Sequence, residues 1–364
     1  MRFRRTGGVS NPATASIGIS EPWSFARGSD DKDALANPIF TIADATIISR
    51  KITGFSGAAL TNIIAGIGGN DINAGVIGAT IAGGGLVVDA SFGIQTEANR
   101  VTGDFGSVGG GFGNTAGEDA TVSGGFKNLA SGVNATVSGG DSNTASGRNS
   151  IAAGGGANTA SEIGATVSGG FNNLAAGIAS FAAGKRAKNR YAGAFMWADN
   201  TNVDFKVAAS EIGVRGWTNP VNTFNVRATG GARFVTAVDG TGFPTAGPYV
   251  NAGSGTWNAT SDRAAKTAIT PINAQAILRK VAALPISSWQ YLSEKGVRHI
   301  GPMGQDFKRL FAVGPDDRPI TTINADGVAL VAIQGLNQIV QKKDAEITAL
   351  KRRLAAIEKR LRIQ

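Results

Sequence analysis

Residues 114–187 read NTAGEDATVSGGFK, NLASGVNATVSGGDS, NTASGRNSIAAGGGA, NTASEIGATVSGGFN and NLAAGIASFAAGKRA when a new unit begins at each recurring asparagine. These asparagines are spaced by 14, 15, 15 and 15 residues, and alanine follows each of them two positions later. They are Asn114, Asn128, Asn143, Asn158 and Asn173. A period of 15 is too short for a helix pair or a propeller blade. It fits two short strands and two turns, which together make one coil of a β-solenoid.

Glycine and asparagine recur at fixed places within these units. A glycine closes each pentamer of the ATVSG type, and glycine permits the positive φ of tight turns. Asparagine also tolerates the left-handed region, so we expect the recurring asparagines at turns, with side chains that stack into a ladder. The alternative is a disordered Gly/Ser/Ala linker, but the fixed columns favour the solenoid. ATIAG from Ala79 and SVGGGFGN from Ser107 are earlier copies of the unit, with insertions.

The composition fits a repetitive body better than one ordinary globular core. Glycine accounts for 52 of 364 residues, whereas aromatic residues make up 7% and charged residues 17%. We therefore predict a mainly β protein with a C-terminal α part: a β-roll, a small β-domain, and an α+β domain that ends in a coiled-coil helix. The predicted segments are an N-terminal lead 1–38, a β-roll head 39–190, a connector 191–256 and an assembly domain 257–364, with the coiled coil at 330–364. The expected core of the connector is Trp197, Trp217, Phe224 and Phe234.

Several classes of function are disfavoured by the composition. The chain has no cysteine and one histidine, so we predict no metal site and no cofactor. The net charge is +9, but residues 333–364 hold eight Lys/Arg against three Asp/Glu, which indicates a solvated helix face rather than a nucleic-acid site. No apolar run approaches the ~18 residues of a membrane span, and no signal peptide is visible.

The end of the chain follows a heptad pattern over more than four repeats. Apolar residues alternate at spacings of three and four, which predicts a coiled coil about 48 Å long. Its core positions are Ile333, Leu336, Val340, Ile347, Leu350, Leu354, Ile357 and Leu361. Lys343 occupies one further core position, where a polar residue sets register. The alternative is a single amphipathic helix that folds back on its own domain. The heptads leave the number of strands open, and lateral association of a thin solenoid favours a homotrimer.

The repeats resemble the heads of trimeric autotransporter adhesins over about 125 residues. In those proteins three left-handed β-rolls pack about a threefold axis, which is the arrangement that the resemblance implies here. This chain departs from them at its C-terminus, because they end in a membrane-anchoring β-barrel and this chain ends in a charged helix.

The junction between the two halves, WNATSDRAAK at 257–266, places Ser261 five positions before Lys266. A serine hydroxyl becomes a nucleophile when a base takes its proton. A lysine becomes that base when burial lowers its pKa towards neutrality. The spacing brings the two side chains together only around a turn. Ser-Asp is equally a polar signal for a turn or a helix start, so the pattern alone leaves both interpretations open.

The C-terminal sequence is similar to the intramolecular chaperone domain of phage tail spikes, tail fibres and endosialidases. The similarity lies in SDRAAKTAITPINAQAILRKVAALPISSWQY, RHIGPMGQDF and DGVALVAIQGLNQIVQKKDAEI, in that order, within residues 257–364. It implies a domain that directs three chains to assemble and then cuts itself off before the serine of an S-D/N-x-x-x-K motif.

Carried onto this chain, the resemblance puts the cleavage site at Thr260–Ser261. It implies that Ser261, Lys266 and His299 are catalytic, with Asp262 and Gln305 in supporting positions. Gly304 stands where the family commonly has alanine.

Three functions follow from these expectations. The first is a trimeric fibre or surface adhesin that cleaves itself once and binds a host glycan or receptor, outside the cell on a virion tail or bacterial surface. The second is a tailspike enzyme that degrades a glycan, which needs paired carboxylates. The acids available for it in the repeats are Glu118, Asp119, Asp141 and Glu162. The third is an uncleaved bacterial surface adhesin.

Overall fold

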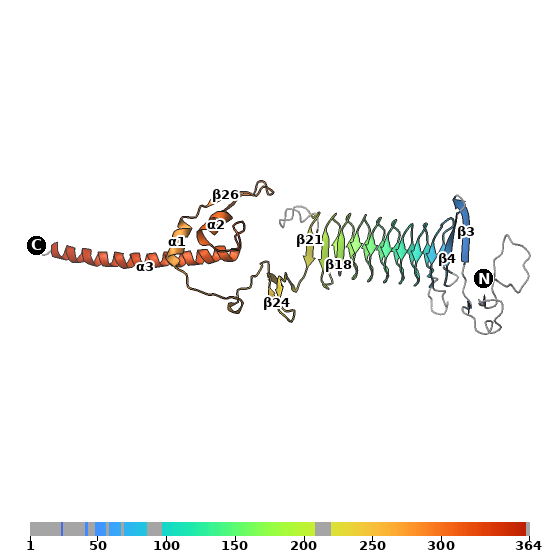
Figure 1. Cartoon of the computed structure of the whole chain (residues 1–364), viewed down its shortest axis with the longest axis horizontal. Coiled ribbons are helices and arrows are strands. Elements are labelled where there is room, and N and C mark those ends of the chain that lie inside the picture. Colours follow the sequence, from blue (N-terminus) through green and yellow to red (C-terminus); the bar gives the residue numbers. More distant parts are fainter. Residues whose placement is uncertain are drawn as a thin grey trace, which may run out of the picture. The chain divides into compact units, whose positions relative to one another are not determined.

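The computed structural model describes residues 23–24, 41–42, 48–55, 58–66, 69–85, 97–207 and 220–361. The chain divides into two compact units, Met1–Ala259 and Thr260–Gln364. The described part of the first unit is built of strands, whereas that of the second contains three α-helices (Figure 1). The predicted lead segment 1–38 lies outside the described residues except for Trp23–Ser24.

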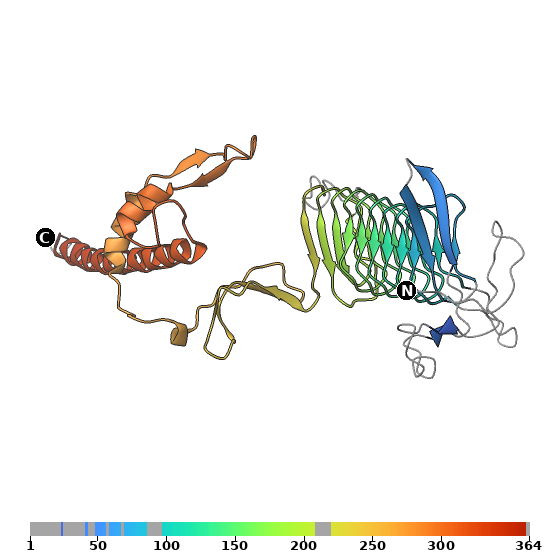
Figure 2. The ribbon, with the colours of Figure 1, turned by 45° about the vertical axis from the view of Figure 1, so that its right-hand side comes forward.

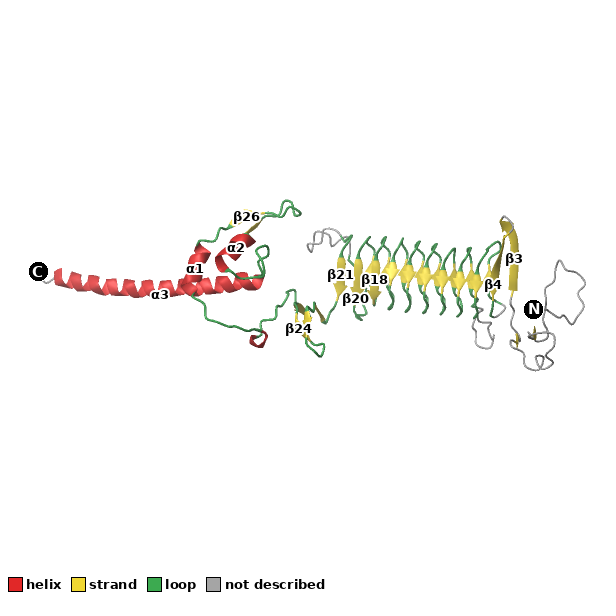
Figure 3. Ribbon diagram, in the orientation of Figure 1, coloured by secondary structure: helices red, strands yellow, loops and turns green. Residues whose placement is uncertain are grey.

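The first unit contains a β-solenoid, which confirms the interpretation of the repeats (Figures 1 and 3). Successive strands of each sheet pair in parallel, as a coil that advances along one axis requires. The larger sheet has 11 strands: β3 (Ile48–Phe55), β4 (Ala58–Ile64), β6 (Thr80–Ile81), β8 (Ser107–Val108), β10 (Thr121–Val122), β12 (Thr136–Val137), β14 (Ile151–Ala152), β16 (Thr166–Val167), β18 (Phe181–Gly184), β20 (Phe195–Ala198) and β21 (Phe224–Arg227). The smaller sheet has 8 strands: β5 (Asp71–Ile72), β7 (Arg100–Val101), β9 (Thr115–Ala116), β11 (Leu129–Ala130), β13 (Thr144–Ala145), β15 (Thr159–Ala160), β17 (Leu174–Ala175) and β19 (Lys188–Asn189).

The N-terminal edge of the larger sheet ends in a hairpin. β3 pairs antiparallel with β4, and β4 pairs in parallel with β6, so β3 covers the edge that the first coil would otherwise leave open (Figure 2). A short separate sheet joins β1 (Trp23–Ser24) to β2 (Thr41–Ile42).

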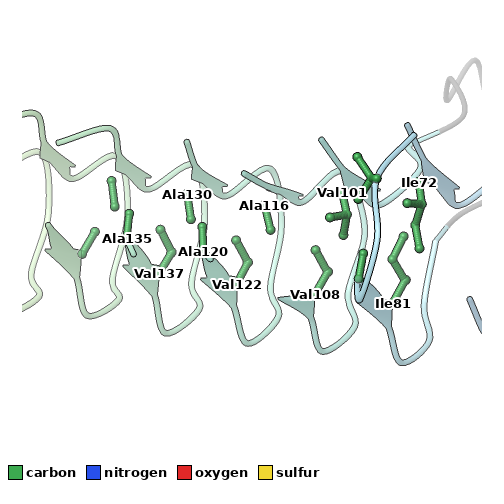
Figure 4. Packing of buried hydrophobic residues seen from close by; sticks show 14 residues of the cluster. Ile72, Ile81, Val101, Val108, Ala116, Ala120, Val122, Ala130, Ala135 and Val137 are labelled. Carbon is green, nitrogen blue, oxygen red and sulfur yellow. The ribbon is translucent and has the colours of Figure 1, made fainter. Parts of the chain in front are cut away.

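The interior of the solenoid is filled by small side chains from both sheets. Val122 and Val137 of the larger sheet lie in register and point towards the alanines of the smaller sheet, Ala116 and Ala130 (Figure 4). All four residues are 0% exposed. Full burial of a valine side chain contributes about 1.5 to 3 kcal/mol, so each coil adds a small stabilising increment. This core is closed within one chain.

A ladder of asparagines runs through the solenoid, as the repeat predicted. Asn143 shows the pattern: its Oδ1 accepts from the backbone N–H of Asn158 at 3.1 Å, and its Nδ2 donates to Gly139 O at 2.9 Å and Gly155 O at 3.0 Å. The buried members are Asn99, Asn114, Asn128, Asn143, Asn158 and Asn173. Each amide therefore satisfies three backbone groups and joins neighbouring coils.

The left-handed residues are not the ladder asparagines, so that part of the expectation is wrong. One column of positive φ is the residue before the ladder asparagine, as in Lys127 (52°), Ser142 (58°) and Ala157 (54°). A second column lies in the other turn of each unit and includes Asn134 and Asn149, both at 56°. An asparagine that points into the core begins a strand, and the chain must turn just before it. The glycine pairs make a second corner, because a Cβ on Gly140 would lie 2.2 Å from Gly155 O.

The solenoid continues past residue 190, where the sequence placed its end, because β20 and β21 extend the parallel pairing of β18. Arg227 fastens this last strand. Its Nε donates to Asp199 Oδ1 at 2.9 Å, and its Nη atoms donate to carbonyls of the preceding coil, including Thr201 O at 3.0 Å and Val203 O at 2.6 Å. These bonds join β21 to the coil before it, and Thr201 O also accepts from the Val203 N–H at 2.9 Å.

The residues after β21 form two small hairpins: β22 (Gly231–Arg233) with β25 (Tyr249–Asn251), and β23 (Ala237–Val238) with β24 (Pro244–Ala246). The predicted aromatic core of the connector is wrong for the described residues. Phe224 and Phe234 are 66% and 55% exposed, and Trp197 is 38% exposed. Trp217 lies outside the described residues. Trp197 and Phe224 lie instead on the solenoid strands β20 and β21, and the ring of Phe234 contacts that of Trp257, with centroids 5.5 Å apart.

The second unit packs two short helices against one long helix. Its elements are the 3-10 turn η4 (Arg263–Ala265), α1 (Ala274–Ala282), β26 (Ser287–Trp289), β27 (His299–Gly301), α2 (Gly304–Phe311) and α3 (Thr322–Leu361). Its core joins Ile277, Phe307, Phe311 and Ala332. Gly335 lets α1 approach α3 closely, because a Cβ there would lie 2.5 Å from Ala274 O.

The long C-terminal helix was predicted, and α3 is 40 residues long. Only Ala332 and Gly335 of α3 are buried among its described residues. The eight predicted core positions from Ile333 to Leu361 are between 46% and 68% exposed in the single chain. No helix in the described residues is long and apolar enough to cross a membrane.

Candidate functional site

One turn of 3-10 helix brings Ser261 and Lys266 together. Asp262 caps this turn, because its carboxylate accepts from the backbone N–H of Ala264 at 3.0 Å. The backbone N–H of Lys266 donates to Arg263 O at 3.1 Å, which closes the turn. Lys266 Nζ then donates to Ser261 Oγ at 2.7 Å. The turn supplies the reversal that the five-residue spacing required.

Both members of this pair are exposed in the single chain. A solvated lysine is an ammonium group at neutral pH, and an ammonium group donates a hydrogen bond but accepts no proton. Desolvation favours the neutral amine, which is a base. The geometry therefore places the Ser261 hydroxyl and the Lys266 amine within hydrogen-bonding distance. For the amine to act as a base, the turn must also be shielded from water.

His299 lies in a different cluster. Its Nε2 is 3.1 Å from Glu294 Oε2. Its ring stacks on Trp289 with centroids 4.7 Å apart, and the edge of Tyr291 approaches it at 5.4 Å. No hydrogen bond or ion pair joins His299 to Ser261 or Lys266 in the part of the chain that the structure describes.

Gln305 is exposed on the first turn of α2, away from both groups of contacts just described. The residue before it explains the departure from the family pattern. A Cβ on Gly304 would lie 2.5 Å from the carbonyl oxygens of Asp317 and Arg318. Glycine is therefore the residue that lets the following loop pass over the start of α2.

The acids that a glycan hydrolase would need are dispersed. Glu118, Asp119, Asp141 and Glu162 are all exposed on the turns of the repeats. Asp141 accepts from the neighbouring Ser142 hydroxyl at 2.7 Å. Among the described residues, no group of three or more His, Asp or Glu side chains is placed to hold a metal ion. No observation at these acids favours glycan hydrolysis.

Sequence reasoning missed the partners of His299. Trp289 is packed between Tyr291 and His299, and its Nε1 is buried with no hydrogen-bond partner. Side chains two residues apart along an extended chain lie on the same side, so Trp289 and Tyr291 are expected side by side. This alternation was the one sequence signal for the aromatic cluster. Glu294 had no such signal, because the turn between β26 and β27 decides where its carboxylate lies.

Residues 261–314 match the family described as chaperone of endosialidase. The match begins at Ser261, the first residue of the turn, and ends just after α2. It confirms the resemblance for this part of the assembly domain. No curated protein matches the chain significantly.

Proposed function

We propose that the protein is a trimeric fibre or surface adhesin of the tail-fibre kind, assembled and then released by its C-terminal domain. A chaperone-of-endosialidase region follows a β-solenoid, an organisation that suggests a tail-fibre-like structural protein. The proposed place of action is outside the cell, on a virion tail or a bacterial surface, with a host glycan or receptor as partner.

Trimerisation is supported by what one chain leaves uncovered. The apolar positions of α3 from Ile333 to Leu361 form one exposed stripe with heptad spacing. A parallel bundle of three copies buries this stripe and aligns the chains. The solenoids then associate as parts of one tethered complex, at a high effective concentration.

The proposed self-cleavage rests on one observation: Lys266 Nζ is hydrogen-bonded to Ser261 Oγ at 2.7 Å. Neutral Lys266 accepts the hydroxyl proton while Ser261 Oγ attacks the carbonyl carbon of Thr260. The Thr260–Ser261 C–N bond breaks, and the nitrogen takes a proton from the lysine ammonium. Water then hydrolyses the resulting ester, which leaves a carboxylate on Thr260 and a free amino group and hydroxyl on Ser261.

The location of this bond supports the same scheme. The boundary between the compact units lies at Ala259/Thr260, one residue before the proposed cut. Cleavage at Thr260–Ser261 therefore separates the solenoid from the assembler without dividing either. We further propose that contact between copies covers the exposed turn, desolvates Lys266 and thereby couples cleavage to assembly. His299 and Gln305 contribute in this scheme only through contacts that one chain does not make.

Expression of the full chain followed by intact mass measurement tests the proposal. We expect a fragment that begins at Ser261, and we expect Ser261→Ala and Lys266→Met to remain whole. Ser254→Ala is the matched control, since Ser254 is a half-buried serine of the same segment, seven residues upstream. A wild-type chain that is trimeric but stays whole would show that cleavage is not part of the function.

A further inference from the structure

The outward face of the larger sheet changes character along the solenoid. In the middle coils the first residue of each strand points outward and is small or aliphatic: Ser107, Thr121, Thr136, Ile151 and Thr166. In the last three strands the same column, in register, is Phe181, Phe195 and Phe224. A mostly Ser/Thr face therefore ends in three phenylalanines.

These rings form an aromatic patch in which Phe181 and Phe195 are half-buried and Phe224 is exposed. Phe181 and Phe195 stack with centroids 4.9 Å apart and planes within 5°, and Phe195 and Phe224 stack at 4.8 Å and 14°. Trp197 and Val226 point outward from the same strands, paired in register. We call these five residues the aromatic patch. Single exposed apolar residues are ordinary, whereas a contiguous group indicates a binding surface.

The strand that carries the outer end of the patch is held firmly. Arg227 follows Val226 directly and is bonded to Asp199 and to carbonyls of the preceding coil. Asp199 Oδ2 in turn accepts from the Thr229 N–H at 2.7 Å. Since β21 is ordered before any partner arrives, binding through the patch requires little further ordering of the chain.

The stacking decides between a sugar and a protein as the occupant. Sugars bind to the open faces of aromatic rings and also need hydrogen-bonding groups. Here both faces of Phe195 and one face each of Phe181 and Phe224 are occupied by a neighbouring ring, so the column offers few open ring faces to a sugar. None of the five side chains of the patch is charged. Such a surface suits burial against another apolar surface.

A second copy of this chain is the partner that fits. Every copy presents the same uncharged patch, and the rest of the column offers only Ser, Thr and Ile side chains, so a copy seated on the patch meets no bulky group along that face. We infer that the aromatic patch is the contact that locks the C-terminal ends of the solenoids to one another. This inference rests on the proposed assembly of several chains and specifies where their solenoids contact one another.

Cross-linking of the full chain tests the contact directly, since the chain contains no cysteine. In Val226→Cys, a short bismaleimide should link copies through position 226. In the control Ile178→Cys, a more exposed aliphatic position on a turn outside the patch, it should not. A trimer with no linkage at position 226 would overturn the inference and leave the proposed function standing. A monomer in light scattering would overturn both.

A second pair of variants tests the energetics. Adding Phe224→Ser to Val226→Cys should slow cross-linking by about tenfold or more, because loss of a buried aromatic anchor weakens association by at least that factor. Phe171→Ser, at another exposed phenylalanine of the solenoid, should leave the rate unchanged. Equal rates in both variants would overturn the inference. So would an unchanged trimer in which Phe224→Ser abolishes retention on a saccharide column.

Discussion

The solenoid and α3 are both regular and long, yet they differ in where their apolar side chains go. In the solenoid the inward valines and alanines of the middle coils are 0% exposed within one chain. In α3 only Ala332 and Gly335 are buried. The solenoid gains its core by stacking each coil on the previous one, whereas α3 has an apolar stripe that its own chain does not cover.

Because of this difference, the two regions depend on different contacts to bury their apolar side chains. Stacking of coils depends on contacts about 15 residues apart along the chain, and such contacts form independently of protein concentration. Burial of the α3 stripe depends on other copies and therefore on concentration. In the proposed assembly, the first region sets the shape of the product, and the second sets how many chains enter it.

The largest effect should come from a charge in the α3 stripe. Leu350→Asp places a carboxylate at a core position in every copy, where an unpaired buried charge costs about 3 to 5 kcal/mol. We expect light scattering to report monomers. Thr348→Asp, two residues earlier on the outer side of the heptad, is the control and should stay assembled. An unchanged mass for Leu350→Asp would mean that α3 does not hold the chains together.

The next largest effect concerns the solenoid, whose stability depends on contacts within one chain. Asn143→Ala leaves the N–H of Asn158 and the carbonyl of Gly139 without their partner, whereas Gly155 O keeps the N–H of Asp141. Unsatisfied buried groups cost about 1 to 3 kcal/mol each, so we expect about 2 to 6 kcal/mol of destabilisation in denaturant titrations followed by circular dichroism. Ser146→Ala, an exposed change in the same coil, should unfold like the wild type. Equal midpoints would refute a structural role for the ladder.

A smaller effect is expected at Lys343, the polar position in the α3 stripe. In the single chain its Nζ lies 2.9 Å from Glu346 Oε2, and this hydrogen bond raises the pKa of Lys343. Lys343→Leu should extend the apolar seam, raise the melting temperature of the assembly by a few degrees and admit more than one oligomeric state. Lys342→Leu is the neighbouring control. A sharper single state in Lys343→Leu would contradict the proposed register role.

The smallest effect should be seen only in the last coil of the solenoid and only at acidic pH. Hydrogen bonds from the Thr229 N–H and hydroxyl hold the pKa of Asp199 far below its usual value. Because this carboxyl has a higher pKa in the unfolded chain, about 3.9, its contribution is present above that pH and is lost as the pH falls below it. We expect the protection factors of the β21 amides, which correct for the intrinsic slowing of exchange in acid, to fall in wild type below about pH 4. In Asp199→Asn exchange should already be fast at neutral pH, and a wild-type rate in that variant would refute the role of Asp199.

The repeat was enough to predict the solenoid, because a fixed period constrains every coil in the same way. The ladder could be predicted because only asparagine recurs in its column. The left-handed positions could not, because Lys127, Ser142 and Ala157 share no residue type and only the backbone geometry marks them. The end of the solenoid was placed too early because the marker residues stop: Ala187 replaces the ladder asparagine and Ala198 replaces the closing glycine. β21 then follows β20 only after a long insertion, which breaks the period.

The residues of the candidate site also fall into those that the sequence could place and those that it could not. The Ser261–Lys266 pair is local, so five residues and one turn suffice to predict its geometry. His299 and Gln305 were assigned by resemblance, and their positions depend on how β27 and α2 pack. The contact of His299 with Glu294 and Trp289 is a property of the β26–β27 hairpin that no spacing in the sequence reveals.

The asparagine ladder also makes the fibre adjustable in length. Each rung contacts only the coil before it and the coil after it, so a coil can be duplicated or deleted without altering the hairpin at one end or the Arg227 cap at the other. Every such change would lengthen or shorten the body by one strand spacing, about 4.8 Å. In the proposed fibre, reach can therefore vary in fixed steps, through changes of about 15 residues that leave the N-terminal hairpin, the Arg227 cap and the C-terminal domain unaltered.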